Sequence, residues 1–320
     1  MNLNQLRSVC EIVNSGLKIS QAAGAMYISQ PSVTRHIKEL EQELGFEVFV
    51  RSQNRVLAVT PRGEEIVRSA RRILQEIENI HELRNEIANS GHGEMTIATT
   101  HTHAKYILPP VVRRFIAKYP NVSLTLHQGN PKECSDLVVQ GQADMAICSN
   151  VKDPSPEVCF IPCYKLRRIV LTGPDHPLLA TQPLTLEALA RYPLVSYDGA
   201  YGGRRIVDQE FSAHHLVPSI ALTATDAEVS KEYVKLGLGV AIFAAVAFDP
   251  KVDSPLRTIP VDHLFQPSMI NLVLRKHSFL RGYIYEFMHF FAPGLNKGVI
   301  EEALFGKADF SVGLDQLPFL

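Results

Sequence analysis

Tryptophan is absent from this sequence, and so is any marked excess of charge. The 320 residues include 32 lysines and arginines against 33 aspartates and glutamates, which gives a formal net charge of −1 at pH 7. No apolar run reaches the roughly 20 residues that cross a bilayer, and residues 1–13 read as an amphipathic helix rather than a signal peptide. We therefore expect a cytoplasmic protein with no membrane partner.

Cysteine is scarce and irregularly placed. The five cysteines form no CxxC pair and are odd in number, which makes a disulfide framework improbable for this chain. Cys159 and Cys163, four residues apart, could act as a redox or metal pair. We favour the alternative that they are small apolar residues on a strand and its flanking turn.

Motifs of common enzymes are missing too. The sequence has no G-x-S-x-G, no Walker P-loop and no complete G-x-G-x-x-G after a strand, since residues 237–239 lack the third glycine. His101 and His103 could hold zinc, but no cysteine or glutamate is spaced to complete the site. The sequence therefore predicts neither catalytic residues nor a metal site.

Two short helical patterns are present near the start. Residues 20–26 are rich in alanine, and small side chains let a second helix cross closely. Ser29 is a plausible N-cap of that second helix, Pro31 lies in its first turn, and Gly45 ends it. One face of the second helix is apolar at spacings of three and four, through Val33, Ile37, Leu40 and Leu44.

The opposite face of the second helix carries side chains that can reach base edges and phosphates from the major groove. They are Gln30, Ser32, Thr34, Arg35 and Lys38. Residues 46–59 read as a two-stranded wing, with Arg51 and Arg55 near its tip to contact phosphates. We expect residues 1–59 to form a winged helix-turn-helix that binds double-stranded DNA. A small helical bundle with a solvated polar face is the alternative.

A long helix should follow from residue 60 to residue 90, with Thr60 as N-cap and Pro61 at its first position. Its apolar residues alternate spacings of four and three, and Arg84 occupies one seam position; they are Ile66, Ala70, Ile73, Ile77, Ile80 and Ile87. Such a heptad seam is typical of paired helices, so we predict a homodimer through this linker. A helix packed on its own domain is the alternative.

Beyond residue 91, strands alternate with helices, which predicts parallel sheets covered on both faces. The expected strands are 95–99, 122–127, 144–148, 168–172, 194–197, 220–224, 240–243 and 270–274. The expected helices are 104–118, 131–140, 186–190, 226–236 and 279–291. No element is assigned beyond about residue 294.

The junction at residues 99–103 is a candidate ligand site. A strand ends there and a helix begins, which presents free backbone N–H groups and the positive end of a helix dipole. Hydroxyls of Thr100 and Thr102 would add neutral donors, so an anion would fit without a buried lysine or arginine. Simple N-capping by Thr102 is the alternative. Thr225 and Asp226 repeat this geometry further along, where Thr225 could form a second cleft wall and Asp226 a helix cap.

Two stretches, AAGAMYISQPSVTRHIKELEQELGFEVFVR and LAVTPRGE, resemble the N-terminus of LysR-type transcriptional regulators. THTHAKYILPPVVRRFIAKYP, GQADMAI and TATDAEVSKEYVKLGLGVAI are similar to the subgroup that governs cysteine biosynthesis and sulfur assimilation. The resemblance covers the whole chain. It implies an α/β fold with an N-terminal winged helix-turn-helix, a long linker helix and an effector domain like a periplasmic binding protein. One subdomain would comprise about 91–161 and 267–320, the other about 162–266, with entry near Pro162 and return near Gln266.

The resemblance also implies an effector. In this subgroup the cleft holds a small anion, typically sulfate, or an O- or N-acetylserine. Carried over by position, and with the second cleft wall included, the candidate contacts are Thr100, Thr102, His103, Ser149, Tyr201, Gly202 and Thr225. His103 stands where the subgroup usually has glutamine, Gly202 where it has threonine, and Leu166 where it has tryptophan. A different small anion is therefore an alternative, and a charged His103 would favour a carboxylate or a dianion.

As a regulator of this family the protein would act as a homotetramer, a dimer of dimers, and would contact RNA polymerase if it is an activator. Effector binding would bias closure of the cleft and thereby change DNA bending. Three alternatives remain: a regulator of another pathway with another anion, a redox sensor built on Cys159 and Cys163, and a solute-binding protein suggested by residues 94–290 alone.

Overall fold

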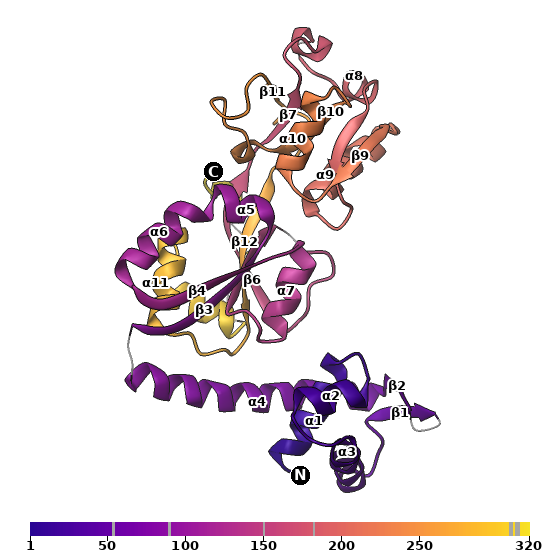
Figure 1. Ribbon diagram of the computed structural model, residues 1–320, viewed down its shortest axis with the longest axis vertical. Coiled ribbons are helices and arrows are strands. Elements are labelled where there is room, and N and C mark those ends of the chain that lie inside the picture. Colours follow the sequence, from indigo (N-terminus) through magenta and orange to yellow (C-terminus); the bar gives the residue numbers. More distant parts are fainter. Residues whose placement is uncertain (53–54, 89–90, 150, 182, 307–309, 311–313) are drawn as a thin grey trace. The chain divides into compact units, whose positions relative to one another are not determined.

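The computed structural model describes residues 1–320 except 53–54, 89–90, 150, 182, 307–309 and 311–313, and the side chains of 82 and 85–88. The chain forms two compact units (Figure 1). The first comprises Met1–Ser90 and His277–Arg281, and the second Gly91–Lys276 and Gly282–Leu320.

Three short helices, a β-hairpin and one long helix build the first unit. They are α1 (Leu3–Asn14), α2 (Ile19–Ala25), α3 (Gln30–Leu44), β1 (Phe49–Ser52), β2 (Arg55–Val59) and α4 (Pro61–Ala88). Ala22 and Ala23 are buried against α3, where Val33, Ile37 and Leu40 form the predicted apolar face. Small side chains on α2 thus allow the close helix crossing that the sequence predicted.

The ends of α3 are set by the predicted caps. Ser29 accepts a hydrogen bond from the Ser32 N–H through its side chain at 3.3 Å, and Gly45 adopts the left-handed conformation with φ of +75°. The antiparallel wing is attached to α3 by Glu41, whose carboxylate accepts hydrogen bonds from the N–H groups of Val48 (2.8 Å) and Phe49 (3.2 Å). The wing is therefore joined to α3 both by these hydrogen bonds and by the shared apolar core.

Helix α4 begins in tight contact with the base of the wing. The Gly63 N–H donates to the Thr60 hydroxyl at 2.9 Å, as expected of an N-cap. A side chain at Gly63 would place its Cβ 2.1 Å from the Val48 carbonyl oxygen, so only glycine fits there.

Further along α4, the apolar residues divide into two groups. Ala70 and Leu74 pack on Leu6 and Cys10 of α1, so one face of the helix is used inside its own unit. Ile73, Ile80 and Leu83 are exposed, with Ile80 at 67%. The side chain of Ile87 lies outside the described residues. The exposed residues leave part of the predicted seam uncovered within this chain.

The second unit contains two five-stranded sheets. In spatial order the first has β4 (Asn121–Gln128), β3 (His92–Thr99), β5 (Met145–Ser149), β12 (Ser268–Arg275) and β6 (Val158–Leu166). The second has β11 (Arg257–Pro260), β7 (Arg168–Thr172), β10 (Val240–Ala244), β8 (Leu194–Tyr197) and β9 (Ile220–Ala224). Figure 1 shows them as two lobes joined through β6–β7 and β12.

Helices cover both sheets. Associated with the first sheet are α5 (His101–Tyr106), α6 (Leu108–Lys118), α7 (Pro131–Val139), α11 (Gly282–Phe291) and α12 (Lys297–Leu304). Associated with the second are α8 (Leu186–Ala190), α9 (Gly202–Ala213) and α10 (Ala227–Lys235). Short 3-10 helices span Pro177–Ala180, Ala245–Ala247 and Leu314–Gln316. Within the described residues, no helix combines the length and apolar character needed to cross a membrane.

The prediction of purely parallel sheets is wrong, because both sheets are mixed. β3 runs parallel to β4 and β5, and β8 runs parallel to β9 and β10. β12, however, is antiparallel to β5 and β6, and β7 is antiparallel to β10 and β11. The reason is the double crossing: β6 leaves the first sheet and β12 returns beside it, so these two strands must run in opposite directions.

The expected helix 104–118 is two helices. The first begins earlier, at His101, and the break falls at Ile107, because Pro109 has no N–H to continue the backbone ladder. The structure also contains β11, α9 and α12, which the sequence analysis did not assign, and it gives bounds to β6, the strand expected around Cys159 and Cys163.

The crossing points between the two sheets are well defined. The chain passes from β6 to β7 at Arg167, so the expected entry near Pro162 falls inside β6. It returns between β11 and β12, the segment that contains Gln266. Arg168 is thus the first residue of the second sheet along the chain, and Ser268 is the first residue of the strand that comes back.

Candidate functional site

The predicted recognition face of α3 is accessible in the first unit. Gln30, Arg35 and Lys38 are exposed, and Ser32 and Thr34 are half-buried. Arg35 is 70% exposed, with its Nε atom 3.7 Å from a Glu39 carboxylate oxygen. An exposed pair at this distance holds the guanidinium only weakly, so Arg35 can turn toward a partner.

The two wing arginines differ. Arg55 is exposed at the start of β2. Arg51 instead makes an ion pair with Glu41 at 2.8 Å, and that carboxylate is nearly buried. Glu41 also accepts hydrogen bonds from the two wing N–H groups. By pairing with this carboxylate, Arg51 helps to hold the wing on α3.

In the second unit, the junction after β3 is closely packed. Thr100 occupies the N-cap position of α5 and Thr102 is already the second residue of that helix, so Thr102 does not act as the cap. The Nδ1 atom of His103 lies 3.1 Å from the Ile147 carbonyl oxygen and 3.2 Å from the Thr100 hydroxyl. Because a carbonyl can only accept, Nδ1 carries the proton and the Thr100 oxygen accepts a share of it.

His103 is not charged at neutral pH. Its side chain is buried, and this desolvation lowers its pKa to about 4, although the hydrogen bond to Ile147 opposes the shift. The alternative in which a charged His103 favours a carboxylate or a dianion is therefore not supported near pH 7. Any ligand beside it meets a neutral imidazole.

Two cavities lie between the subdomains of the second unit. One, of about 370 Å³, is lined by Thr102, Lys105 and Gln128 on one side and by Asp226 and Glu228 on the other. The second, of about 390 Å³, is lined by residues that include Tyr201 and Gly202 opposite Asn130 and Lys132.

Of the predicted effector contacts, Thr102, Tyr201 and Gly202 line one or other of these cavities. Tyr201 is the N-cap of α9 and Gly202 its first residue, so the expected loop there is the start of a helix. Thr100, His103, Ser149 and Thr225 line neither cavity. Asp226 caps α10 by accepting from the Val229 N–H at 2.9 Å, as predicted, while Thr225 is exposed.

Two residues that the sequence interpretation missed lie beside the predicted ones. The Tyr197 hydroxyl is buried and has no hydrogen-bond partner of ordinary geometry among the described residues. Burial raises the pKa of Tyr197 to about 12, with the nearby Thr102 hydroxyl opposing the rise.

Arg168 is the second residue that was missed. Its side chain is buried, its Nε donates to the Gln266 carbonyl oxygen at 3.3 Å, and its Nη2 donates to the Ser268 hydroxyl. Desolvation lowers the pKa of Arg168 to about 10, which still leaves it protonated at pH 7. The signal in the sequence was an arginine opening an otherwise apolar strand.

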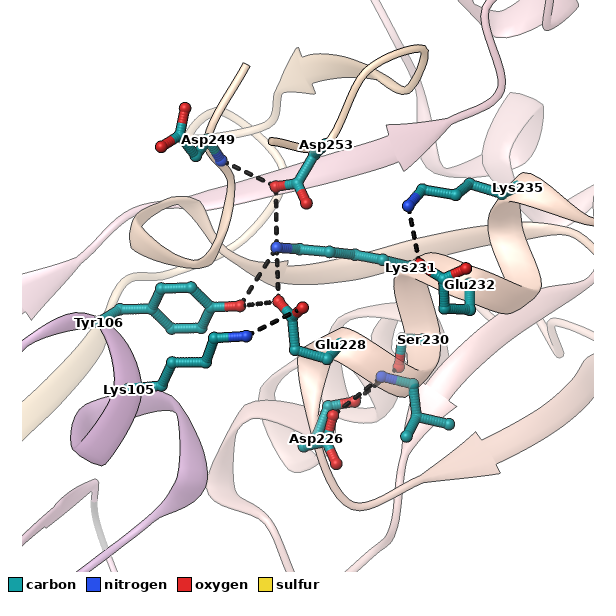
Figure 2. Close-up of polar contacts among 11 residues, drawn as sticks. Lys105, Tyr106, Asp226, Glu228, Ser230, Lys231, Glu232, Lys235, Asp249 and Asp253 are labelled. Atoms are coloured by element: carbon teal, nitrogen blue, oxygen red, sulfur yellow. Dashed lines mark hydrogen bonds and ion pairs between the residues drawn. The ribbon is translucent and has the colours of Figure 1, made fainter. Parts of the chain in front are cut away.

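A polar cluster connects the two subdomains beside the first cavity (Figure 2). Lys105 and Tyr106 of α5 meet Glu228 and Lys231 of α10. The buried Lys231 ammonium lies 2.9 Å from Glu228, 3.1 Å from the Tyr106 hydroxyl and 2.8 Å from Asp253. Lys105 is 2.9 Å from the other Glu228 oxygen, and the Tyr106 hydroxyl also donates to Glu228.

The charges of this cluster are mutually stabilised. Partial burial opposes ionisation of Glu228, but hydrogen bonds from Lys231, Tyr106 and Lys105 lower its pKa to about 2. Burial and the adjacent Glu228 raise the pKa of Tyr106. The cluster therefore holds α5 and α10 together across the subdomain boundary at neutral pH.

The cysteines lie in unreactive surroundings. All five are buried thiols, and burial raises the pKa of Cys159 to about 11 and of Cys163 to about 12. Both belong to β6, whereas the flanking turn was expected to hold one of them. Raised thiol pKa values argue against a redox sensor, since the thiolate is the reactive form. Among the described residues, no group of three or more potential ligands could hold a metal ion.

The chain matches known proteins along almost its whole length. Residues 3–64 match the family described as bacterial regulatory helix-turn-helix protein, lysR family, and residues 88–295 match the LysR substrate binding domain. The HTH-type transcriptional regulator CysB of Haemophilus influenzae is 42% identical over 303 residues, 95% of this chain and 94% of that protein. CysB of Burkholderia cenocepacia is 42% identical over 309 residues, 97% of this chain and 99% of that protein.

The second unit is also similar to a solved structure of a transcriptional regulator domain. The cofactor-binding domain of the Cbl transcriptional regulator is 34% identical, with a TM-score of 0.65, over 68% of this chain and 96% of that one.

Proposed function

The chain belongs to the LysR family of bacterial transcriptional regulators, and from this premise we propose that it controls sulfur and cysteine genes in response to a small anion. The assignment to this pathway rests on the 42% identity to two CysB regulators over nearly the full length of both proteins. The sequence signatures quoted above for the cysteine-biosynthesis subgroup support the same assignment.

For DNA binding, α3 is the element that would enter the major groove. Arg35 and Lys38 are exposed on its outer face, with Gln30 at its first turn and the half-buried Ser32 and Thr34 beside them. Arg55 on the wing would contact a phosphate, and Arg51 would do so only while holding Glu41. The first 72 residues contain ten lysines and arginines against seven glutamates, a net of +3 that dimerisation doubles.

The effector would bind between the two sheets of the second unit. We assign it the side chains predicted from sequence, namely Thr100, Thr102, His103, Ser149, Tyr201, Gly202 and Thr225. Thr102 lines one cavity and Gly202 the other, and the buried Tyr197 hydroxyl close to Thr102 offers a further donor. Sulfate, O-acetylserine and N-acetylserine are the candidate ligands, and no metal or other cofactor is required.

Dimerisation would use α4. Its first half is packed on α1, but Ile73, Ile80 and Leu83 are left exposed on a helix whose heptad spacing suits a partner. Two such dimers would form the homotetramer of the family, and as an activator the protein would contact RNA polymerase. Closure of the effector cleft around its ligand would be the signal passed to DNA.

The test is a thermal-stability panel on the full-length protein with sulfate, thiosulfate, O-acetylserine, N-acetylserine and simple carboxylates. A ligand that binds only the folded state raises the unfolding midpoint. Thr102→Val should abolish the shift, whereas Thr125→Val, on the exposed edge of β4, should keep it. A shift by another anion alone would reassign the pathway, and a shift that survives in Thr102→Val would exclude that residue from the site.

A further inference from the structure

Residues 314–320 form a short added edge on the first sheet. The Lys165 N–H donates to the Pro318 carbonyl oxygen at 2.9 Å, and the Leu320 N–H donates to the Lys165 carbonyl oxygen at 3.0 Å, as in a parallel pair of strands. The Lys165 ammonium also donates to the Asp315 carbonyl oxygen at 2.7 Å. Because β6 is the outermost strand of its sheet, this segment pairs part of an otherwise open edge. Figure 1 marks the end of the segment with C, where the two lobes join.

One aromatic ring of this segment lies against two cations. The Phe319 ring centroid is 4.6 Å from the Lys165 ammonium nitrogen and 4.3 Å from the Arg167 guanidinium carbon. Successive side chains of an extended strand point to opposite faces, so Lys165 and Arg167 emerge on the same side, and the buried Leu166 points to the other. Each cation is attracted to the electron-rich face of the ring. The ring therefore joins Lys165, inside β6, to Arg167, which follows that strand.

Arg167 is the single residue between β6 and β7, so the chain crosses there from the first sheet to the second. Its backbone carbonyl accepts a hydrogen bond at 2.9 Å from the N–H of Ala245, which follows β10 of the second sheet. Its guanidinium pairs at 3.2 Å with Asp262, which belongs to the returning segment 261–267. We call Arg167 and residues 261–267 the hinge, because a rotation between the two sheets must change backbone dihedral angles in these two connections.

We propose that residues 314–320 are a strap on this hinge, which restrains rotation between the two sheets. The strap is bound to the first sheet at Lys165, and its Phe319 ring holds the side chain of Arg167, whose carbonyl is bonded to the second sheet. A rotation that moves Arg167 must therefore break its contact with the ring or pull the strap away from β6.

The strap can detach while the core stays folded. Phe319 is 43% exposed, and hydrogen bonds and cation–π contacts at a surface are individually weak. Such a restraint goes beyond the proposed function, because it would act on closure of the cleft whichever ligand binds there. Loss of the strap would make the hinge turn more readily even in protein without ligand.

The test is hydrogen–deuterium exchange of the full-length protein without ligand, resolved to single amides by mass spectrometry. The Ala245 amide reports on the hinge, since its hydrogen bond to Arg167 must break when this connection turns. In Phe319→Ala, and in a chain that stops after residue 313, this amide should exchange about tenfold faster than in wild type. Asp315→Ala is the matched control, because Asp315 contacts β6 through its backbone carbonyl, which the substitution keeps, and it should behave as wild type.

A segment that merely covers the sheet edge gives a different pattern. The Lys165 amide would then exchange faster while the Ala245 amide stays as in wild type, and that outcome overturns the inference. Where these variants unfold the domain, the Leu272 amide in β12 also exchanges fast, and Phe319→Leu decides. Leucine keeps an apolar cover but offers no π face to Arg167, so Ala245 should again exchange faster while Leu272 does not. Wild-type exchange of Ala245 in Phe319→Leu overturns the strap.

Discussion

The ammonium nitrogen of Lys231 lies 2.8 Å from a carboxylate oxygen of Asp253, and both side chains are buried. Lys231 also donates to Glu228 and Tyr106, so one cation serves two subdomains (Figure 2). Removing this cation leaves the buried Asp253 carboxylate without an opposite charge. The free-energy cost of that uncompensated charge is larger than the net stabilisation that the intact pair provides.

Lys231→Met should therefore destabilise the protein by about 3–5 kcal/mol. Urea unfolding followed by circular dichroism measures this. Lys235→Met, which removes a more exposed pair with Glu232 one turn later, is the control and should cost about 0–1 kcal/mol. Equal losses in the two variants would show that the Lys231 pair is not effectively buried.

His103 should make stability depend on pH. Burial lowers its pKa to about 4 in the folded protein, while an unfolded histidine titrates near 6.5. The unfolded chain thus binds the proton first as pH falls, so the stability is complete above pH 6.5 and is lost progressively down to about pH 4. Between pH 7 and pH 4, wild type should lose roughly 3 kcal/mol more free energy of unfolding than His103→Gln. Urea titrations at both pH values compare them, and parallel losses would mean that His103 is solvated.

Arg35→Ala should weaken operator binding by about 1–3 kcal/mol without lowering the unfolding midpoint, since Arg35 is exposed and its contact with Glu39 is loose. Arg55→Ala should lower the slope of log affinity against log salt by about one. Fluorescence anisotropy at several salt concentrations gives both values. Arg113→Ala, an exposed arginine on α6, is the control. Operator affinity unchanged in Arg35→Ala would remove it from the contact surface.

Ile80→Arg should reduce dimer formation, because it places a charge in the exposed apolar seam of α4. Ile116→Arg is the matched control: Ile116 is 49% exposed and belongs to α6 rather than to α4. Sedimentation velocity at micromolar concentration should show a smaller species for Ile80→Arg alone. The same mass for both variants would place the dimer interface elsewhere.

Native cysteines should resist alkylation. A pKa of about 11 for Cys159, against 9.0 for a free thiol, reduces its thiolate fraction at pH 8 by about 100-fold, and burial restricts access further. Iodoacetamide labelling followed by mass spectrometry should be slow in buffer and fast in urea, and peroxide should leave operator affinity unchanged. Rapid native labelling of Cys159 or Cys163 would revive the redox alternative.

The features predicted well from sequence were the local ones. Ser29, Gly45 and Thr60 cap helices through contacts a few residues away, so their identity and position were enough to predict them. The features missed depend on distant partners. Arg168 is buried because β7 lies between β10 and β11, and those strands come some 70 and 90 residues later.

The same limit applies to α9 and to His103. Gly202 and Gly203 favour a loop by local propensity, but α9 forms because Val207 and Phe211 are buried in the core of the second sheet. The imidazole of His103 is neutral because it is buried, and its contact with Ile147 on a neighbouring strand shows that this burial depends on residues distant in sequence. Thr100 and Thr102 were identified since they follow a strand directly, whereas Tyr197 has no comparable signal.

Gly63 determines how closely the long helix can approach the wing. Any other residue there would place its Cβ against the Val48 carbonyl oxygen, so the start of α4 keeps this position only with glycine. In the proposed dimer, each protomer would carry the same contact, and a change at Gly63 would alter the angle between α4 and β1 in both DNA-binding heads at once.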